Sequence, residues 1–163
     1  MADVRVKAYG LAAAAFALDR LTKWIIRTHV SAFDVHRVIP GFFDIVHSEN
    51  RGVAFGLLND SHSAWHTLVL VVFSAAALVL IAALLWKTAR SDAWTAMSLA
   101  LILGGAAGNL FDRIIFGQVT DFLEFYIGDL HWPTFNVADS CVVIGSALLL
   151  LDLLRPKRQP AQT

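Results

Sequence analysis

Long apolar stretches dominate the hydrophobic pattern of this chain, and polar residues gather mainly between them. Four of these stretches approach or reach the length of about 20 residues that a helix needs to span the hydrocarbon core of a membrane. We expect spanning helices near residues 8–26, 66–86, 94–116 and 136–154. The pattern predicts an all-α membrane protein with one integral membrane domain over residues 1–163.

The first apolar stretch also has features of a cleavable signal peptide. Arg5 and Lys7 precede a run rich in Ala and Leu, as in secretory leaders. The run continues through Asp19 and Lys23 without a typical cleavage site, which favours a retained span.

Basic residues flank the predicted spans on one side of the membrane, which the positive-inside rule makes the cytoplasmic side. We therefore expect both termini to be cytoplasmic and the segments 28–65 and 117–135 to be extracytoplasmic. The flanking residues are Arg5, Lys7, Lys87, Arg90, Arg155, Lys157 and Arg158.

The first extracytoplasmic segment contains signals for a turn and a strand. Pro40 and Gly41 favour a turn, and the following residues 42–47 are mostly apolar and aromatic. We expect a small extracytoplasmic β-sheet lying on the membrane surface. Trp65 and Trp132 suit the same interfacial depth.

The composition agrees with a membrane class. Of the 163 residues, 57% are hydrophobic and 16% are charged, whereas soluble domains have about 45–50% and 25%. The formal net charge of zero gives no indication of nucleic-acid binding. Cys141 is the only cysteine, so the chain forms no intrachain disulfide and no metal site with several cysteines.

Strongly polar residues interrupt the first, third and fourth spans, where an ionisable group is costly unless it faces protein partners. A rise of about 1.5 Å per residue places these groups at similar depth, in the outer half of the membrane. Spacings of three and four residues put the polar groups of each span on one stripe of its helix. We expect a single polar cluster, with Asp121 of the next segment within reach of Asp139. Its members within the spans are Asp19, Lys23, Asn109, Asp112, Arg113, Asn136 and Asp139.

Within this cluster, charge balance separates structural candidates from catalytic ones. We interpret Asp19 with Lys23, and Asp112 with Arg113, as charge-balanced structural pairs. Asp121 and Asp139 have no local cation in the sequence, which makes them the better candidates for chemistry.

Two carboxylates that share a site can hydrolyse a peptide bond without a metal, because the pair retains one proton. The ionised carboxylate takes a proton from water while its protonated partner polarises the scissile carbonyl. Ser140 and Cys141 adjoin Asp139, but no histidine lies in either nearby span to activate them. We expect these two residues to pack the start of the helix.

Five motifs resemble those of bacterial lipoprotein signal peptidases, the signal peptidase II family, in the same order and over nearly the whole chain. They are DRLTK at 19–23, NRGVAF at 50–55, GGAAGNLFDR at 104–113, VTDF at 119–122 and FNVADS at 135–140.

The resemblance implies an aspartic endopeptidase of the bacterial cytoplasmic (inner) membrane, with its active site near the outer face. Such an enzyme removes the signal peptide of a prolipoprotein before a cysteine that carries diacylglyceryl lipid. It requires no cofactor or metal, contacts membrane lipids, and is inhibited by the cyclic peptide globomycin. By motif, Asp121 and Asp139 correspond to the catalytic pair. Substrate-binding or orienting residues would be Asn50, Asn109, Arg113 and Asn136, with Asp19, Lys23, Gly105 and Asp112 supporting the site.

The main alternative from another class is a proton-coupled membrane transporter, because intramembrane Asp, Asn and Arg also form proton relays. Transporters usually carry internal repeats and place polar groups near the midplane. This chain has no evident repeat, and its polar groups are expected near one face. A presenilin-type protease is disfavoured because Tyr126 stands where a Gly-x-Gly-Asp motif ending at Asp129 needs glycine.

Overall fold

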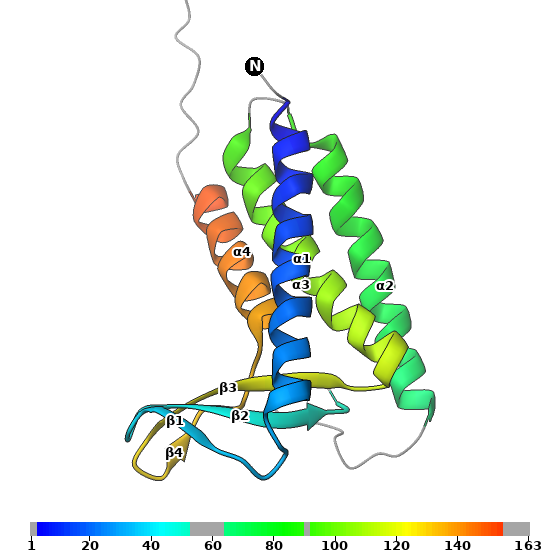
Figure 1. Ribbon diagram of the computed structural model, residues 1–163. Coiled ribbons are helices and arrows are strands. Elements are labelled where there is room, and N and C mark those ends of the chain that lie inside the picture. The colour runs from blue at the N-terminus through cyan, green and yellow to red at the C-terminus, as the bar shows by residue number, and fades with distance from the viewer. Residues whose placement is uncertain (1–2, 53–63, 90–91, 155–163) are drawn as a thin grey trace, which may run out of the picture.

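Long helices form a bundle, and a small sheet lies across one end of it (Figure 1). The structure is a computed structural model that describes residues 3–52, 64–89 and 92–154. The helices of the described residues are α1 (Val4–His29), α2 (Ala64–Lys87), α3 (Ala93–Phe116) and α4 (Val137–Leu154). Each coincides with one of the predicted spans, and the ends differ by a few residues.

Acidic side chains start two of these helices. Asp3 accepts a hydrogen bond from the backbone N–H of Arg5 at 3.1 Å, and Asp92 accepts one from Thr95 at 3.1 Å. Such caps satisfy backbone donors that have no partner within the helix. The starts of α1 and α3 lie at the same end of the bundle, away from the sheet.

Within the described residues, three helices are long and apolar enough to cross a membrane, namely Thr67–Lys87 of α2, all of α3 and all of α4. Helix α1 has 26 residues but carries several charged side chains, including Asp19 and Lys23. A mostly helical membrane protein is therefore confirmed, whereas the fourth span stays a prediction.

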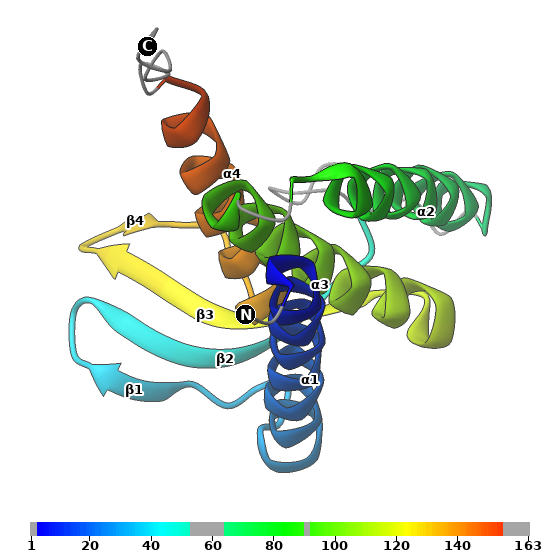
Figure 2. The same cartoon turned by 90° about the horizontal axis from the view of Figure 1, so that it is seen from above.

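Helix α3 lies at the centre and packs against α1, α2 and α4 (Figure 2). Small residues permit this close packing: a Cβ at Gly104 would lie 2.5 Å from the carbonyl oxygen of Ala12 on α1. The core at this level contains Ala8, Leu99 and Ala100. By contrast, α2 turns large apolar side chains outward, as a lipid-facing helix does.

The sheet contains β1 (His36–Ile39), β2 (Phe43–Asn50), β3 (Val119–Ile127) and β4 (Leu130–His131). Its order is β1-β2-β3-β4, and neighbouring strands are antiparallel. The predicted small sheet is confirmed, and the strand expected at residues 42–47 corresponds to β2. Gly41, with φ of 80°, adopts the left-handed conformation in the turn before it.

Gly117 connects the bundle to the sheet. It ends α3 with φ of 71°, and its N–H donates to the carbonyl of Arg113 at 3.1 Å. Strand β3 starts two residues later, which brings Asp121 back over the end of the helices. Strand β3 was not predicted from the sequence.

Part of the predicted topology concerns residues outside the described ranges. Residues 53–63 of the first segment expected to be extracytoplasmic lie there, as do four of the basic flanking residues, Arg90, Arg155, Lys157 and Arg158. Arg5, Lys7 and Lys87 belong to the helix ends away from the sheet.

Candidate active site

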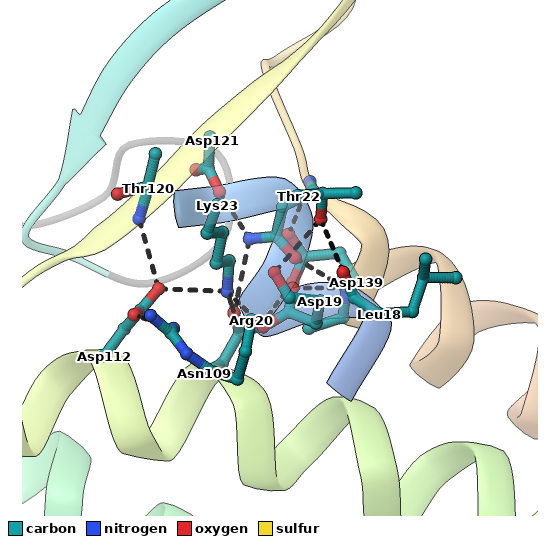
Figure 3. Close-up of polar contacts among 12 residues, drawn as sticks. Leu18, Asp19, Arg20, Thr22, Lys23, Asn109, Asp112, Thr120, Asp121 and Asp139 are labelled. Atoms are coloured by element: carbon teal, nitrogen blue, oxygen red, sulfur yellow. Dashed lines mark hydrogen bonds and ion pairs between the residues drawn. The ribbon is translucent and has the colours of Figure 1, made fainter. Parts of the chain in front are cut away.

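The polar residues predicted to cluster come together where the helices meet the sheet. Figure 3 shows Asp19, Lys23, Asn109, Asp121 and Asp139 converging from α1, α3, β3 and α4. The structure thus places two acidic residues from separate elements inside one network of buried amides and charges.

Asp121 is 2% exposed and points from β3 into this network. Its two carboxylate oxygens accept hydrogen bonds from different amides: Asn50 Nδ2 donates to Oδ2 at 3.1 Å, and Asn136 Nδ2 donates to Oδ1 at 2.7 Å. Asn50 is positioned by the pairing of β2 with β3, in which it lies opposite Val119. The sheet therefore holds both Asp121 and one of its two donors.

Asp139 lies in the first turn of α4, where a carboxylate is favoured by the free N–H groups of the helix start. Asn109 of α3 donates from Nδ2 to Oδ1 of Asp139 at 2.7 Å. Asn136 and Asp139 also cap each other: the N–H of Asn136 donates to Oδ2 at 3.2 Å, and the N–H of Asp139 donates to Oδ1 of Asn136 at 3.0 Å. This reciprocal cap fixes Asp139 relative to the start of α4.

The two carboxylates also interact electrostatically. Burial and, to a smaller extent, the negative charge of Asp139 raise the pKa of Asp121 to about 6, while the amides of Asn50 and Asn136 and the charge of Lys23 act in the opposite direction. Asp121 therefore retains its proton to a higher pH than an exposed aspartate does.

Lys23 anchors the network beneath the carboxylates. Its ammonium lies 2.9 Å from Oδ1 of Asn109, and 3.0 Å from an oxygen of Asp19 and of Asp112. Asp19, Lys23 and Asp112 are all 0% exposed, and the three contacts match the three donors of an ammonium group. The predicted pairing of Asp19 with Lys23 is therefore present in the structure.

Asp19 also helps to position α4. Its Oδ1 accepts a hydrogen bond from the backbone N–H of Ala138 at 3.0 Å. This N–H belongs to the first turn of α4 and has no partner within the helix. Asp19 thus links α1 to the helix start that carries Asp139.

Asp112 has different partners from the one expected. It pairs with Arg20, with Lys23 at 3.0 Å and with Arg27 at 2.8 Å, all from α1. The interpretation of Asp112 and Arg113 as a structural pair was wrong, because residues adjacent in a helix do not face each other.

Three residues of this region were missed from the sequence: Arg20, Arg27 and Thr120. Arg27 donates from Nε to Thr120 Oγ1 at 2.7 Å. The spacing of Arg20, Lys23 and Arg27, three and then four residues apart, was a signal that could have identified a basic stripe on α1.

Arg113 of α3 carries a charge that acts on both members of the acidic pair. Its charge interacts with Asp139, Asp121 and Asp112. Its side chain donates to the carbonyl oxygen of Asn109 at 3.4 Å. The position suits a residue that orients the pair or contacts a bound peptide.

Glycines of α3 bring α4 and α1 close to the network. A Cβ at Gly105 would overlap the carbonyl oxygen of Ala138, and one at Gly108 would overlap the carboxylate of Asp19. Glycine at these positions therefore allows α3 to approach both the start of α4 and the buried Asp19.

Neither neighbouring nucleophile has an activating base in the described residues. Ser140 Oγ donates to the carbonyl oxygen of Asn136 at 3.0 Å, which is a helix-start contact, and Cys141 is half-buried. Among residues 3–52, 64–89 and 92–154, no group of three or more His, Cys, Asp or Glu side chains could hold a metal ion. The acidic pair is the arrangement in this region that can activate water.

Comparison with known proteins identifies the family. The model of the signal peptidase (SPase) II family matches residues 11–155. The lipoprotein signal peptidase of Solibacter usitatus (strain Ellin6076) is 65% identical over 161 residues, which cover 99% of this chain and 98% of that protein. That of Maridesulfovibrio salexigens is 41% identical over 140 residues, covering 86% and 90%.

The fold gives the same result. Two solved structures of bacterial membrane enzymes match with TM-scores of 0.82 and 0.80 and identities of 27% and 29%. The matches cover 94% and 93% of this chain, and 94% of each solved chain. The resemblance carried by the five motifs is confirmed, and the chain belongs to the signal peptidase II family.

Proposed function

We propose that this chain is a membrane endopeptidase that removes signal peptides from diacylglyceryl-modified prolipoproteins, with Asp121 and Asp139 as its catalytic pair. The observation that carries the proposal is the buried hydrogen-bonded link between the pair through Asn136, which donates to both carboxylates. Membership of the signal peptidase II family and the names of the relatives support the substrate class.

Asp139 is the base of the proposed reaction and Asp121 is the acid. Because the pKa of Asp121 is raised to about 6 by burial and by the charge of Asp139, Asp121 holds the proton of the resting pair. Asp139 takes a proton from water as the water oxygen attacks the scissile carbonyl carbon, and Asp121 donates a hydrogen bond to the carbonyl oxygen. The C–N bond then breaks, and the departing amine takes up the proton that Asp139 received.

The surrounding amides keep the pair in position during this exchange. Asn50 and Asn136 hold Asp121 through separate oxygens, and Asn109 holds Asp139. Fixed donors of this kind stabilise developing charge without reorganising as the reaction proceeds. Arg113 is the proposed contact for the peptide or the carboxylates, since its charge interacts with both members of the pair.

The proposed location follows from the bundle. With α1 as a fourth span and both termini in the cytoplasm, the sheet and the acidic pair lie at the outer face of the bacterial inner membrane. A lipid-modified cysteine lies at this depth, because its acyl chains stay in the outer leaflet. The partners are lipid-modified prolipoproteins, membrane lipids and inhibitors of the globomycin type.

The transporter alternative is not favoured. The family match and the identity to lipoprotein signal peptidases both indicate a peptidase. The polar residues also gather at the sheet end of the bundle, whereas a transported ion would need polar groups along a path through it.

Three assays test the proposal: cleavage, proton uptake and reporter fusions. Purified protein in detergent or nanodiscs is incubated with a diacylglyceryl-modified prolipoprotein and with the same precursor lacking lipid, and the released signal peptide is identified by mass spectrometry. Cleavage of only the lipidated precursor, before the modified cysteine, supports it. Proton uptake into vesicles without any cleavage would instead indicate a transporter. Reporters fused after residue 46 and after Lys87 test the proposed orientation. The first should read extracytoplasmic and the second cytoplasmic, and a cytoplasmic signal from the first contradicts the proposed orientation.

A further inference from the structure

Arg27 joins three elements at the point where they enclose the acidic pair. From α1, its Nε donates to Oγ1 of Thr120 on β3 at 2.7 Å, and its Nη2 donates to Oδ1 of Asp112 on α3 at 2.8 Å. The backbone N–H of Thr120 also approaches Oδ2 of Asp112 at 3.5 Å. These contacts form a closed polar ring that attaches the start of β3 to α3.

Two residues of this ring, Thr120 and Asp112, are each linked to one member of the acidic pair. Thr120 immediately precedes Asp121 in β3. Asp112 lies three residues after Asn109, on the same side of α3, and Asn109 donates to Asp139. The attachment of β3 to α3 through Arg27 therefore connects the backbone of one carboxylate to the amide that holds the other.

The guanidinium of Arg27 is itself held in place. Its Cζ lies 3.8 Å from the centre of the Phe116 ring, and its side chain is 20% exposed. Stacking on Phe116 fixes the plane of the guanidinium, so that its donors are aimed at Thr120 and Asp112 together. An ammonium group lacks this planar fork and would not hold both acceptors in the same way.

We propose that Arg27 is a positioning residue for peptide cleavage, which sets the separation of Asp121 and Asp139 by bridging Thr120 to Asp112. This inference rests on the proposed function, because it assumes that the two carboxylates act as a pair. Arg27 itself does not touch the reacting atoms; it acts through the strand and the helix that carry them.

The sharpest test replaces the acceptor rather than the arginine. Thr120→Val keeps the shape of the buried side chain but removes the oxygen that Arg27 binds, while Thr120→Ser keeps that oxygen. Thr28→Val is the matched control, since Thr28 follows Arg27 on α1 and, among the described contacts, its hydroxyl donates to carbonyl oxygens of its own helix and otherwise contacts only neighbouring His29. Cleavage of a lipidated prolipoprotein is measured with each variant, together with thermal unfolding.

Misplaced catalytic groups lower turnover more than binding, so Thr120→Val is expected to lower kcat by about tenfold while KM stays close to the wild-type value. Thr120→Ser should restore most of the turnover, and Arg27→Met should resemble Thr120→Val. The double variant Arg27→Met with Thr120→Val should be little worse than either single variant, because both remove the same bridge.

The pH profile separates positioning from a general loss of stability. Charged groups that act on Asp121 are Asp139 from α4, Lys23 from α1 and Arg113 from α3. A wider separation weakens the upward effect of Asp139 on the pKa of Asp121. The high-pH limb of kcat/KM should therefore move to lower pH in Thr120→Val and stay in place in Thr28→Val.

Two results would overturn the inference: a Thr120→Val enzyme with wild-type kcat and pH profile, or one whose activity loss follows its fraction unfolded and disappears at low temperature. Failure of the proposed function looks different. In that case Asp121→Asn or Asp139→Asn would retain cleavage, whatever the behaviour of the Thr120 variants.

Discussion

Asn136 donates a hydrogen bond from its side-chain amide to Oδ1 of Asp121 at 2.7 Å, while its backbone N–H lies 3.2 Å from Oδ2 of Asp139. One residue at the start of α4 thus contacts both carboxylates. Asn136 is fully buried, so these contacts are made away from water, where the low local dielectric strengthens hydrogen bonds. The two aspartates are therefore coupled through a single rigid group.

The first prediction is that Asp121→Asn and Asp139→Asn each nearly abolish cleavage while the protein remains folded. Asparagine keeps the shape of aspartate but can neither take a proton from water nor hold the proton shared by the pair. The double variant should be little worse than either single variant, because the two residues act as a unit. Turnover of a lipidated prolipoprotein and thermal unfolding are measured in parallel.

The matched controls for this experiment are Ser140→Ala and Cys141→Ala, which adjoin Asp139 but should keep substantial activity. Binding of a globomycin-type inhibitor to the asparagine variants checks that the site is intact. A folded Asp139→Asn enzyme that cuts at nearly the wild-type rate would end the acidic-pair mechanism. An inactive but folded Ser140→Ala would point to a serine nucleophile instead.

The second prediction concerns pH. Burial and the charge of Asp139 raise the pKa of Asp121 to about 6, so the folded protein loses this proton as the pH rises through about 6. Because Asp121 is the acid in the free enzyme, kcat/KM should fall above that pH. The contribution of Asp121 to folding stability also falls as the pH rises. This contribution is fully present below the unfolded pKa of about 3.9 and is lost as Asp121 ionises in the folded state.

Both effects are measured by recording kcat/KM and the thermal midpoint between pH 4 and pH 9, roughly the range in which carboxylates of this kind titrate. The Asp121→Asn variant serves as the control, since its thermal midpoint should lack the component that is lost near the pKa of Asp121. A kcat/KM that rises steadily with pH through neutrality contradicts Asp121 as the acid.

The third prediction is that Lys23→Met strongly destabilises the protein, by about 3–5 kcal/mol. The change removes the partner of fully buried Asp19 and one partner of fully buried Asp112. Exposed Lys7 on the same helix provides the matched control, and Lys7→Met should leave the thermal midpoint nearly unchanged.

A second change makes this experiment more specific. Adding Asp19→Asn to Lys23→Met removes the charge left without a partner, and part of the lost stability should return. Equal thermal midpoints for Lys23→Met and Lys7→Met would show that the buried ammonium contributes little to folding.

The fourth prediction is that chelators leave cleavage intact. The acidic pair needs no metal for the proposed reaction. In the described part of the chain, no cluster of His, Cys, Asp or Glu could bind one. The purified protein is assayed before and after prolonged treatment with a chelator. Activity that is lost and then restored by added zinc would refute the metal-free mechanism.

The features that could be predicted from the sequence are those set by local patterns. Span length and the spacing of polar residues within each helix depend only on helix geometry, and they located the four helices and the cluster around Asp19, Asn109 and Asp139. The turn at Gly41 likewise identified strand β2 from adjacent residues.

The features that were missed depend on contacts between distant segments. Strand β3 carries Asp121, and its run Val119–Ile127 is rich in β-branched and aromatic residues, yet it is a strand because β2 pairs with it. The partners of Asp112 are a second case. Arg113 is adjacent in sequence but points elsewhere on α3, whereas Arg20 and Arg27 approach Asp112 from another helix.

The last prediction tests whether close packing of α3 on α4 positions Asp139. A Cβ at Gly105 would overlap the carbonyl oxygen of Ala138, which directly precedes Asp139. Gly105→Ala must therefore push the start of α4 away, and we expect a loss of about 1–3 kcal/mol of stability together with reduced turnover. Gly10→Ala is the matched control, because a Cβ on Gly10 of α1 meets nothing within 4 Å. That change should be neutral or should stabilise α1 by up to about 1 kcal/mol, since alanine favours the helix. Thermal unfolding and cleavage are measured for both variants, and equal behaviour would show that α4 can move without disturbing Asp139.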